Sequence, residues 1–128
     1  MIMVDTNSLA AVTVNDPELM ISKPASLTAA TGMDALTHAV EAVVANGAMD
    51  VTDATALYAI RQIFEYLPRA VKHGNDIEAR EQMCYSCFLN GIAFSNVGLG
   101  NVHAMAHQLG GLYGLPHRVW YKEMVDVQ

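Results

Sequence analysis

From residue 24 onward, apolar residues recur three and four positions apart, and this spacing constrains the fold more than any other feature. One face of a helix repeats at these intervals, whereas a strand alternates at every second residue. The first such stretch opens at Pro24 and Ser26 and ends at Asn46 and Gly47. It predicts a helix, weakened near its middle by Gly32, with one buried face made of Leu27, Ala30, Met33, Leu36, Ala39, Val40 and Val43.

Two further helices are predicted by the same spacing. The second begins near Thr52 or Asp53 as N-cap, and Pro68 forces it to kink or stop, since proline lacks an N–H group. Its apolar positions are Ala56, Leu57, Ile60, Phe64 and Leu67. The third opens at residues 75–78, which resemble a capping box, and its apolar positions are Met83, Cys87, Leu89, Ile92 and Phe94.

The two ends of the chain complete the expected fold. A fourth helix is predicted over about residues 101–109, ending at the glycine pair 110–111. Residues 9–14 are β-branched and partly alternating, and residues 15–17 follow with turn chemistry, so one short strand is expected there. The fold class is therefore mainly α, with a single short N-terminal strand.

Length and charge restrict the classes of partner. A chain of 128 residues is long enough for one domain with a core. With 13 acidic and 7 basic residues its net charge is -6, which disfavours nucleic acid as a partner. No run of about 18 apolar residues predicts a membrane span, and the N-terminus lacks the pattern of a secretory signal. These features predict a cytoplasmic protein with no nucleic-acid or membrane partner.

Histidines in helical stretches suggest a metal site. Asp34 and His38 lie four residues apart, as do His103 and His107, so each pair shares one face of its helix. His117 follows in a predicted loop. A single pair of this kind is more often a solvated polar pair than a metal site. Both pairs, however, lie on apolar helices, where unpartnered polar groups are costly and a shared ion would satisfy them. The residue types suit Zn(II) or Fe(II).

Four other polar or reactive side chains have simpler interpretations. Glu41 could accept a hydrogen bond from an imidazole N–H, although an exposed acid on the helix edge is the more common situation. His73 lies at a predicted helix end, where the helix dipole accounts for it. Cys84 and Cys87 form an isolated C-x-x-C without a second pair, so structural thiols are expected.

Several catalytic motifs are excluded by single residues. Ala104 stands where the glutamate of H-E-x-x-H would be, so His103 and His107 are not a metalloprotease motif. His103 also occupies the third glycine position of a G-x-G-x-x-G fingerprint that would start at Gly98. No G-x-S-x-G nucleophile elbow is present. A metal-dependent hydrolase would need a general base, for which only Glu41 is a candidate.

Three segments resemble the iron-containing (group III) alcohol dehydrogenases, in the branch of the 1,3-propanediol, lactaldehyde and methanol dehydrogenases. They are DPELM at residues 16–20, LTAATGMDALTHAVE at residues 27–41 and GNVHAMAHQLGG at residues 100–111. The similarity extends from about residue 12 to residue 117. It implies the helical metal-binding part of the dehydroquinate-synthase-like fold.

The resemblance also implies the site and its chemistry. Asp34, His38, His103 and His117 would be the four metal ligands, and His107 would lie beside the nicotinamide and the substrate. The metal would be Fe(II), with Zn(II) possible, and the cofactor NAD or NADP. The substrate would be a small alcohol or aldehyde, which the ion polarises while a hydride moves between carbon and nicotinamide.

Both ends of the chain depart from this family. Residues 1–15 would be the remaining strand of a truncated nucleotide-binding domain, residues 16–117 the helical metal-binding domain, and residues 118–128 an atypical tail beginning with Arg118. Such a fragment would bind metal but be weakly active or inactive alone. The alternative is a catalytically dead helical fragment that serves as an oligomerisation or interaction module. The 52% of hydrophobic residues predicts a homo-oligomer in either case.

Overall fold

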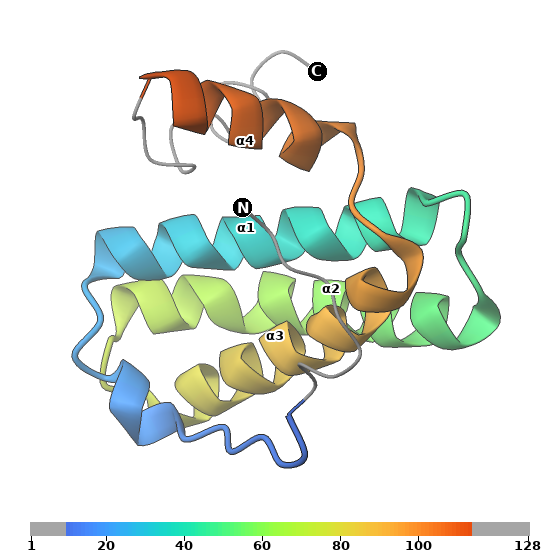
Figure 1. The fold of residues 1–128 in the computed structure, drawn as a ribbon. Helices are drawn as coiled ribbons and strands as arrows, with labels where there is room; N and C mark the ends of the chain where they lie inside the picture. Colours follow the sequence, from blue (N-terminus) through green and yellow to red (C-terminus); the bar gives the residue numbers. More distant parts are fainter. Residues whose placement is uncertain (1–9, 114–128) are drawn as a thin grey trace.

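The computed structural model describes residues 10–113, and in this range the protein is helical. A short 3-10 helix precedes four α-helices in the order η2 (Pro17–Met20), α1 (Ala25–Val44), α2 (Asp50–Lys72), α3 (Ile77–Val97) and α4 (Asn101–Tyr113). Helices α1, α2 and α3 pack against one another as a bundle. Helix α4 lies beside α1, on the side facing away from α2 and α3 (Figure 1). No described helix has the length and apolar character needed to cross a membrane.

The bundle packs through small residues. The fully or nearly buried positions of α1 include Gly32, Ala35, Ala39 and Ala42, which are spaced by three and four residues. Those of α2 repeat in the same way and are Thr52, Ala56, Ala59, Ile63, Leu67 and Ala70. Small side chains allow two helix axes to approach closely, so backbone contact replaces the interlocking of large side chains.

The helices were predicted correctly, but the prediction of which residues on them are buried was largely wrong. Leu27 and Val40 of α1 and Leu57 and Phe64 of α2 are exposed, although the apolar spacing placed them in the core. On α3 the buried set is Ala79, Arg80, Met83, Ser86, Asn90 and Ala93, which shares only Met83 with the prediction. Ranking positions by hydrophobicity therefore selected the large residues, whereas the bundle selects the small ones.

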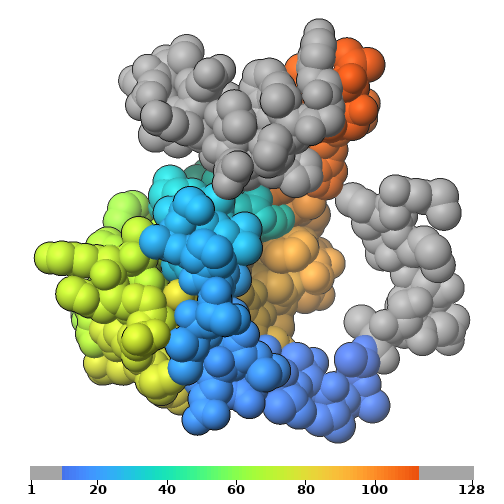
Figure 2. Space-filling view, turned by 90° about the vertical axis from the view of Figure 1, so that its left-hand side faces the viewer, coloured from blue at the N-terminus to red at the C-terminus, as the bar shows by residue number. Residues whose placement is uncertain are grey.

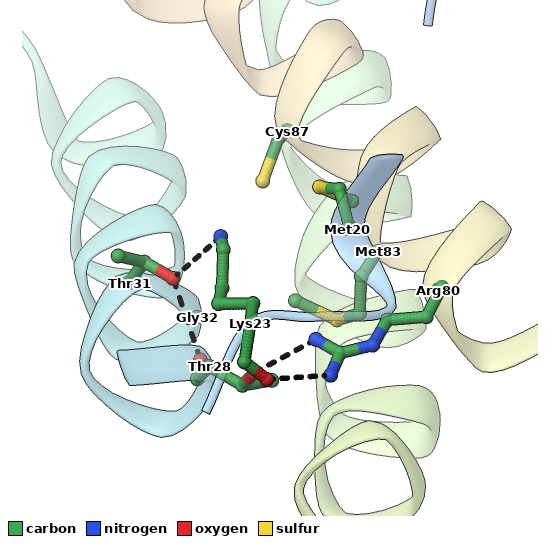
Figure 3. Close-up of a pocket in the computed structure, with 8 residues that line it drawn as sticks. All are labelled: Met20, Lys23, Thr28, Thr31, Gly32, Arg80, Met83 and Cys87. Atoms are coloured by element: carbon green, nitrogen blue, oxygen red, sulfur yellow. Dashed lines mark hydrogen bonds between the residues drawn. The ribbon is translucent and has the colours of Figure 1, made fainter. Parts of the chain in front are cut away.

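A buried arginine links three segments at one end of the bundle, where α1 and α3 begin and α2 ends. Arg80 of α3 is 2% exposed, and its guanidinium donates to the Thr28 hydroxyl at 2.7 Å and to the backbone oxygens of Lys23 at 3.1 Å and Gly74 at 3.0 Å. Arg80, Thr28 and Lys23 border a cavity of about 40 Å³ between η2, α1 and α3 (Figure 3). In the space-filling view, η2 and the start of α1 lie in blue against the yellow-green ends of α2 and α3 (Figure 2).

The predicted N-terminal strand is not formed in the described residues. Residues 10–14 have no regular secondary structure, and residue 9 lies outside the described range. A strand is stable only when its backbone groups pair with a neighbouring strand. Since the described residues contain no strand, the β-branched composition of this segment has nothing to pair with.

The structure also corrects two predictions about where helices end. Of the kink or stop predicted at Pro68, the stop does not occur: helix α2 continues to Lys72, because proline removes only one hydrogen bond and here lies in the last turns. Helix α4 continues through Gly110 and Gly111 to Tyr113. A glycine ends a helix by adopting a positive φ angle, and Gly98, directly after α3, is the one glycine in the described residues that does so.

Candidate metal centre

Three of the predicted ligands meet where α4 lies against α1. Asp34 and His38 lie one turn apart on α1, and His103 projects from the first turn of α4. One donor atom of each residue lies within 4.8 Å of the other two. His103 is 2% exposed, whereas Asp34 and His38 are half-buried. The cluster is therefore buried at His103 and partly open to solvent at Asp34 and His38.

His38 is held in one orientation by its own helix. Its Nδ1 lies 2.9 Å from the backbone oxygen of Asp34, one turn earlier. A carbonyl only accepts, so Nδ1 carries the proton and Nε2 keeps its lone pair. The ring also stacks on Phe94 of α3, with 4.6 Å between centroids, and lies 3.9 Å from the His103 ring.

His103 is oriented by a carboxylate from the other helix. Its Nδ1 lies 2.6 Å from Oε2 of Glu41, and its Nε2 lies 3.5 Å from Oδ1 of Asp34. Glu41 is 6% exposed and also accepts hydrogen bonds from backbone N–H groups at the start of α4. The prediction of an exposed acid was therefore wrong, and the less favoured alternative of an imidazole acceptor is what the structure shows.

The charge states follow from these contacts. Burial lowers the pKa of His38, and the neighbouring His103 lowers it further, so the His38 imidazole is neutral over a wider pH range. Burial alone would raise the pKa of Glu41. The hydrogen bonds from Gly100 N–H, His103 and Val102 N–H outweigh burial and lower this pKa. A neutral imidazole is the state of His38 that can bind a metal, and the ionised carboxylate of Glu41 is the state that accepts the hydrogen bonds of residues 100–103.

The other predicted site residues lie outside this cluster. His107 is exposed one turn further along α4, and its ring meets the His103 ring edge-on at 6.1 Å. His117 lies outside the described residues. His73 is exposed at the C-cap of α2, consistent with its exclusion from the site. Glu41 is the residue whose role the sequence analysis underestimated. The available signal was its position three residues after His38, on the same side of the helix.

The donor set suits a divalent ion. For tetrahedral coordination at about 2.1 Å, neighbouring ligand atoms lie about 3.4 Å apart. The separation of 3.5 Å between His103 Nε2 and Asp34 Oδ1 is close to that value. Both imidazoles donate Nδ1–H to an oxygen acceptor, which is the usual arrangement around a metal-bound histidine. One carboxylate and two imidazoles accommodate either Fe(II) or Zn(II).

Comparison with known proteins finds similar sequences among dehydrogenases. The chain is 58% identical over 118 residues to the 1,3-propanediol dehydrogenase of Klebsiella pneumoniae, covering 92% of this chain and 30% of that protein. It is 56% identical over 116 residues to the NAD-dependent methanol dehydrogenase of Bacillus methanolicus, covering 91% of this chain and 30% of that protein. The chain thus spans less than a third of the length of these relatives.

A solved structure agrees with this similarity. The crystal structure of a 1,3-propanediol oxidoreductase superposes with a TM-score of 0.85 at 60% identity, covering 88% of this chain and 30% of that one. Residues 28–121 match the C-terminal region of the Fe-containing alcohol dehydrogenase family. The chain therefore belongs to the Fe-containing alcohol dehydrogenase family.

Proposed function

We propose that Asp34, His38 and His103, together with His117, bind a divalent metal ion, and that this ion serves an alcohol dehydrogenase reaction with NAD or NADP. The observation that carries the proposal is the convergence of three donor atoms from two helices within 4.8 Å. The names of the relatives support the reaction class, since they include a propanediol and an NAD-dependent methanol dehydrogenase. Fe(II) is the proposed ion, and Zn(II) is the alternative.

One residue near the cluster, His107, is suited to remove the hydroxyl proton of an alcohol bound there. A bound ion supplies Lewis-acid polarisation of an alcohol oxygen. In the oxidation the substrate C–H bond breaks, the hydrogen passes with the bonding electron pair to the nicotinamide as hydride, and the C=O bond of the aldehyde forms as the hydroxyl proton leaves. His107 is exposed one turn beyond His103, so we assign it the transfer of that proton to solvent. The substrate class is a small alcohol or its aldehyde.

Metal content tests the binding site directly. The chain is incubated anaerobically with Fe(II), or with Zn(II), desalted and measured by elemental analysis. We expect near-stoichiometric metal in the wild type and its loss in His38→Ala. His73→Ala is the matched control, because it removes an exposed imidazole outside the cluster. Equal metal in both variants, or trace metal in the wild type, would contradict the proposal.

Two further variants test the remaining residues. His117→Ala should weaken metal binding if His117 completes the coordination. His107→Ala should leave metal content unchanged, since its proposed role is in proton transfer, and should slow NAD reduction in any preparation with measurable turnover. Loss of metal from His107→Ala would contradict the role assigned to it.

Large apolar side chains on the bundle surface favour a second candidate function, association. On α2 alone, Val51 is 66%, Leu57 54% and Phe64 68% exposed. Exposed apolar side chains that gather on one element often mark an interaction surface. Association through α2 predicts a homo-oligomer that Phe64→Ser shifts towards the monomer, as measured by sedimentation equilibrium. An unchanged distribution would count against this surface.

A further inference from the structure

Glu41 is a buried carboxylate whose described partners all come from one short segment. It lies on α1, three residues after His38, and is 6% exposed. An ionised carboxylate at such a position is strongly destabilising unless hydrogen bonds and charges compensate for lost water. Here every hydrogen bond that its two oxygens accept comes from residues 100–103.

The first consequence is that Glu41 caps α4 from another helix. Oε2 accepts from Gly100 N–H at 2.9 Å, and Oε1 accepts from Val102 N–H at 2.8 Å and His103 N–H at 3.4 Å. These are N–H groups that the start of a helix leaves without an intrahelical acceptor. The negative charge also lies at the positive end of the α4 dipole. The cap therefore fixes the start of α4 against α1.

The second consequence concerns the His103 ring. Because the ionised carboxylate accepts and cannot donate, the contact of 2.6 Å places the imidazole proton on Nδ1. The lone pair is then on Nε2, which lies 3.5 Å from Asp34 Oδ1. One carboxylate thus sets the position of the helix and the tautomer of its histidine.

The connection between α3 and α4 is shaped around this carboxylate. Gly98 has a φ angle of 87°, which favours glycine. A Cβ atom on Gly100 would lie 2.8 Å from Oε1 and 2.9 Å from Cδ of Glu41, so only glycine leaves room for the side chain. Contacts between α4 and the other helices are otherwise sparse in the described residues. The glycine pair that resembles part of a dinucleotide fingerprint therefore has a packing reason.

We propose that Glu41 is a positioning residue for the metal centre, one that holds α4 on α1 and keeps His103 in the tautomer with the proton on Nδ1 and the lone pair on Nε2. The inference rests on the proposed metal site, but it concerns a residue that contacts no ion itself. Its role is to make two ligands from α1 and one from α4 available at the same time.

Glu41→Gln tests this role with almost no change in size. A glutamine offers one acceptor and one NH₂ group where four donors now converge. If the NH₂ group faces Gly100 and the ring, His103 must accept through Nδ1 and move its proton to Nε2. If the NH₂ group faces Val102, it meets the backbone N–H groups of Val102 and His103, which are also donors. In either case the present arrangement, with the proton of His103 on Nδ1 and all four donors satisfied, is disfavoured.

The measurement is a competition titration of the 128-residue chain with Zn(II), together with the visible absorption of its Co(II) form. We expect an affinity about 10- to 100-fold weaker for Glu41→Gln, as for other partners of metal-bound histidines, and a changed Co(II) spectrum. Glu81→Gln on the exposed surface of α3 is the matched control and should bind like the wild type. Equal affinity and an unchanged spectrum for Glu41→Gln would overturn the proposal.

A metal-free measurement separates this inference from the proposed function. The ¹⁵N resonances of His103 report which ring nitrogen is protonated, at a pH where the imidazole is neutral. We expect Nδ1–H in the wild type and Nε2–H or a mixture in Glu41→Gln. If the wild type binds no metal, the proposed function fails, while the tautomer result still decides whether Glu41 orients His103. An identical tautomer in both proteins would overturn the positioning role.

A second variant covers the case in which Glu41→Gln does not fold. Gly100→Ala leaves the carboxylate in the chain but occupies its space. It should weaken Zn(II) binding in the same direction as Glu41→Gln. Gly111→Ala, within α4, is the matched control, because nothing lies within 4 Å of the added methyl group. Wild-type affinity in Gly100→Ala would contradict the close fit around Glu41.

Discussion

The contact between α1 and α2 depends on the absence of a side chain at Gly32. A Cβ atom at this position would lie 2.8 Å from Cδ2 and 3.0 Å from Cγ of Leu67, and closer still to Cδ1. Leu67 is 8% exposed and belongs to the core cluster with Ile63 and Met83, so it has little space to move. We predict that Gly32→Ala forces α1 and α2 apart or drives Leu67 into an unfavourable rotamer.

The magnitude follows from two opposing effects. Replacing a helical glycine by alanine stabilises a helix by about 0.8–1 kcal/mol when space is available. Inserting a methyl group into a filled core costs about 1–3 kcal/mol. Gly91 of α3 is the matched control, since nothing lies within 4 Å of a Cβ atom there. Gly91→Ala should therefore be more stable than the wild type, and Gly32→Ala less stable than Gly91→Ala by about 1–3 kcal/mol.

Urea unfolding followed by far-UV circular dichroism gives the free energy of unfolding of each variant. The cause is tested by adding Leu67→Ala, which removes the atoms that the new methyl group meets. The two substitutions should then be less destabilising together than the sum of their separate effects, with a coupling of about 0.5–3 kcal/mol. If Gly32→Ala were as stable as Gly91→Ala, or if the pair were additive, the close approach of α1 and α2 would be refuted.

Three further predictions concern other parts of the described structure. Arg80→Met should lower the free energy of unfolding by about 1.5–3 kcal/mol, the value of one charge-assisted hydrogen bond, because the buried Thr28 hydroxyl and two partly buried backbone oxygens lose their donor. Asp76→Ala should destabilise the chain at neutral pH by removing the α3 cap. The hydrogen bond from Ala79 N–H lowers the pKa of Asp76 below its ordinary 3.8, so its stabilisation is complete above that pH and is lost as the pH falls through the lowered value. Urea unfolding at several pH values should therefore show the difference from wild type shrinking in acid. Desolvation raises the pKa of the Cys84 and Cys87 thiols, so at neutral pH both should react with a disulfide reagent more slowly than in the unfolded chain, and equal rates would contradict this.

Helix positions were predictable from the sequence because they depend on local features. The breaks at Gly47 and Gly74 separate the helices as expected, since turn and cap residues act over a few positions, and the N-cap of α3 is Asp76, within the predicted segment 75–78. The strand predicted at residues 9–14 does not form in the described residues, and local features do not decide whether a strand forms. Pairing depends on a partner elsewhere, and β-branched composition alone does not provide one.

The buried faces could not be predicted from hydrophobicity for a related reason. Burial in this bundle follows how closely the helix axes approach, and small residues such as Ala39 and Ala42 permit the closest approach. Large residues such as Phe64 gain more from burial in general, but a position on a helix is buried only if another element covers it. The sequence of one helix does not specify which of its faces will be covered.

The metal cluster was predictable to the extent that its residues had an unusual type and spacing. The pair Asp34 and His38 is local, so helix geometry alone places both side chains on one face. His103 lies more than 60 positions further along the chain. It was assigned to the same site only on the assumption that polar groups on apolar helices share a partner. The structure brings the three residues together. Glu41 carries no such signal by itself, because an acid on a helix is commonly exposed. Its burial depends on Gly100 and on a left-handed turn at Gly98, which together let α4 begin directly at its carboxylate. A sequence search for such positioning residues should therefore examine acids one turn from a ligand together with glycines just before the next ligand helix, since neither feature is informative alone.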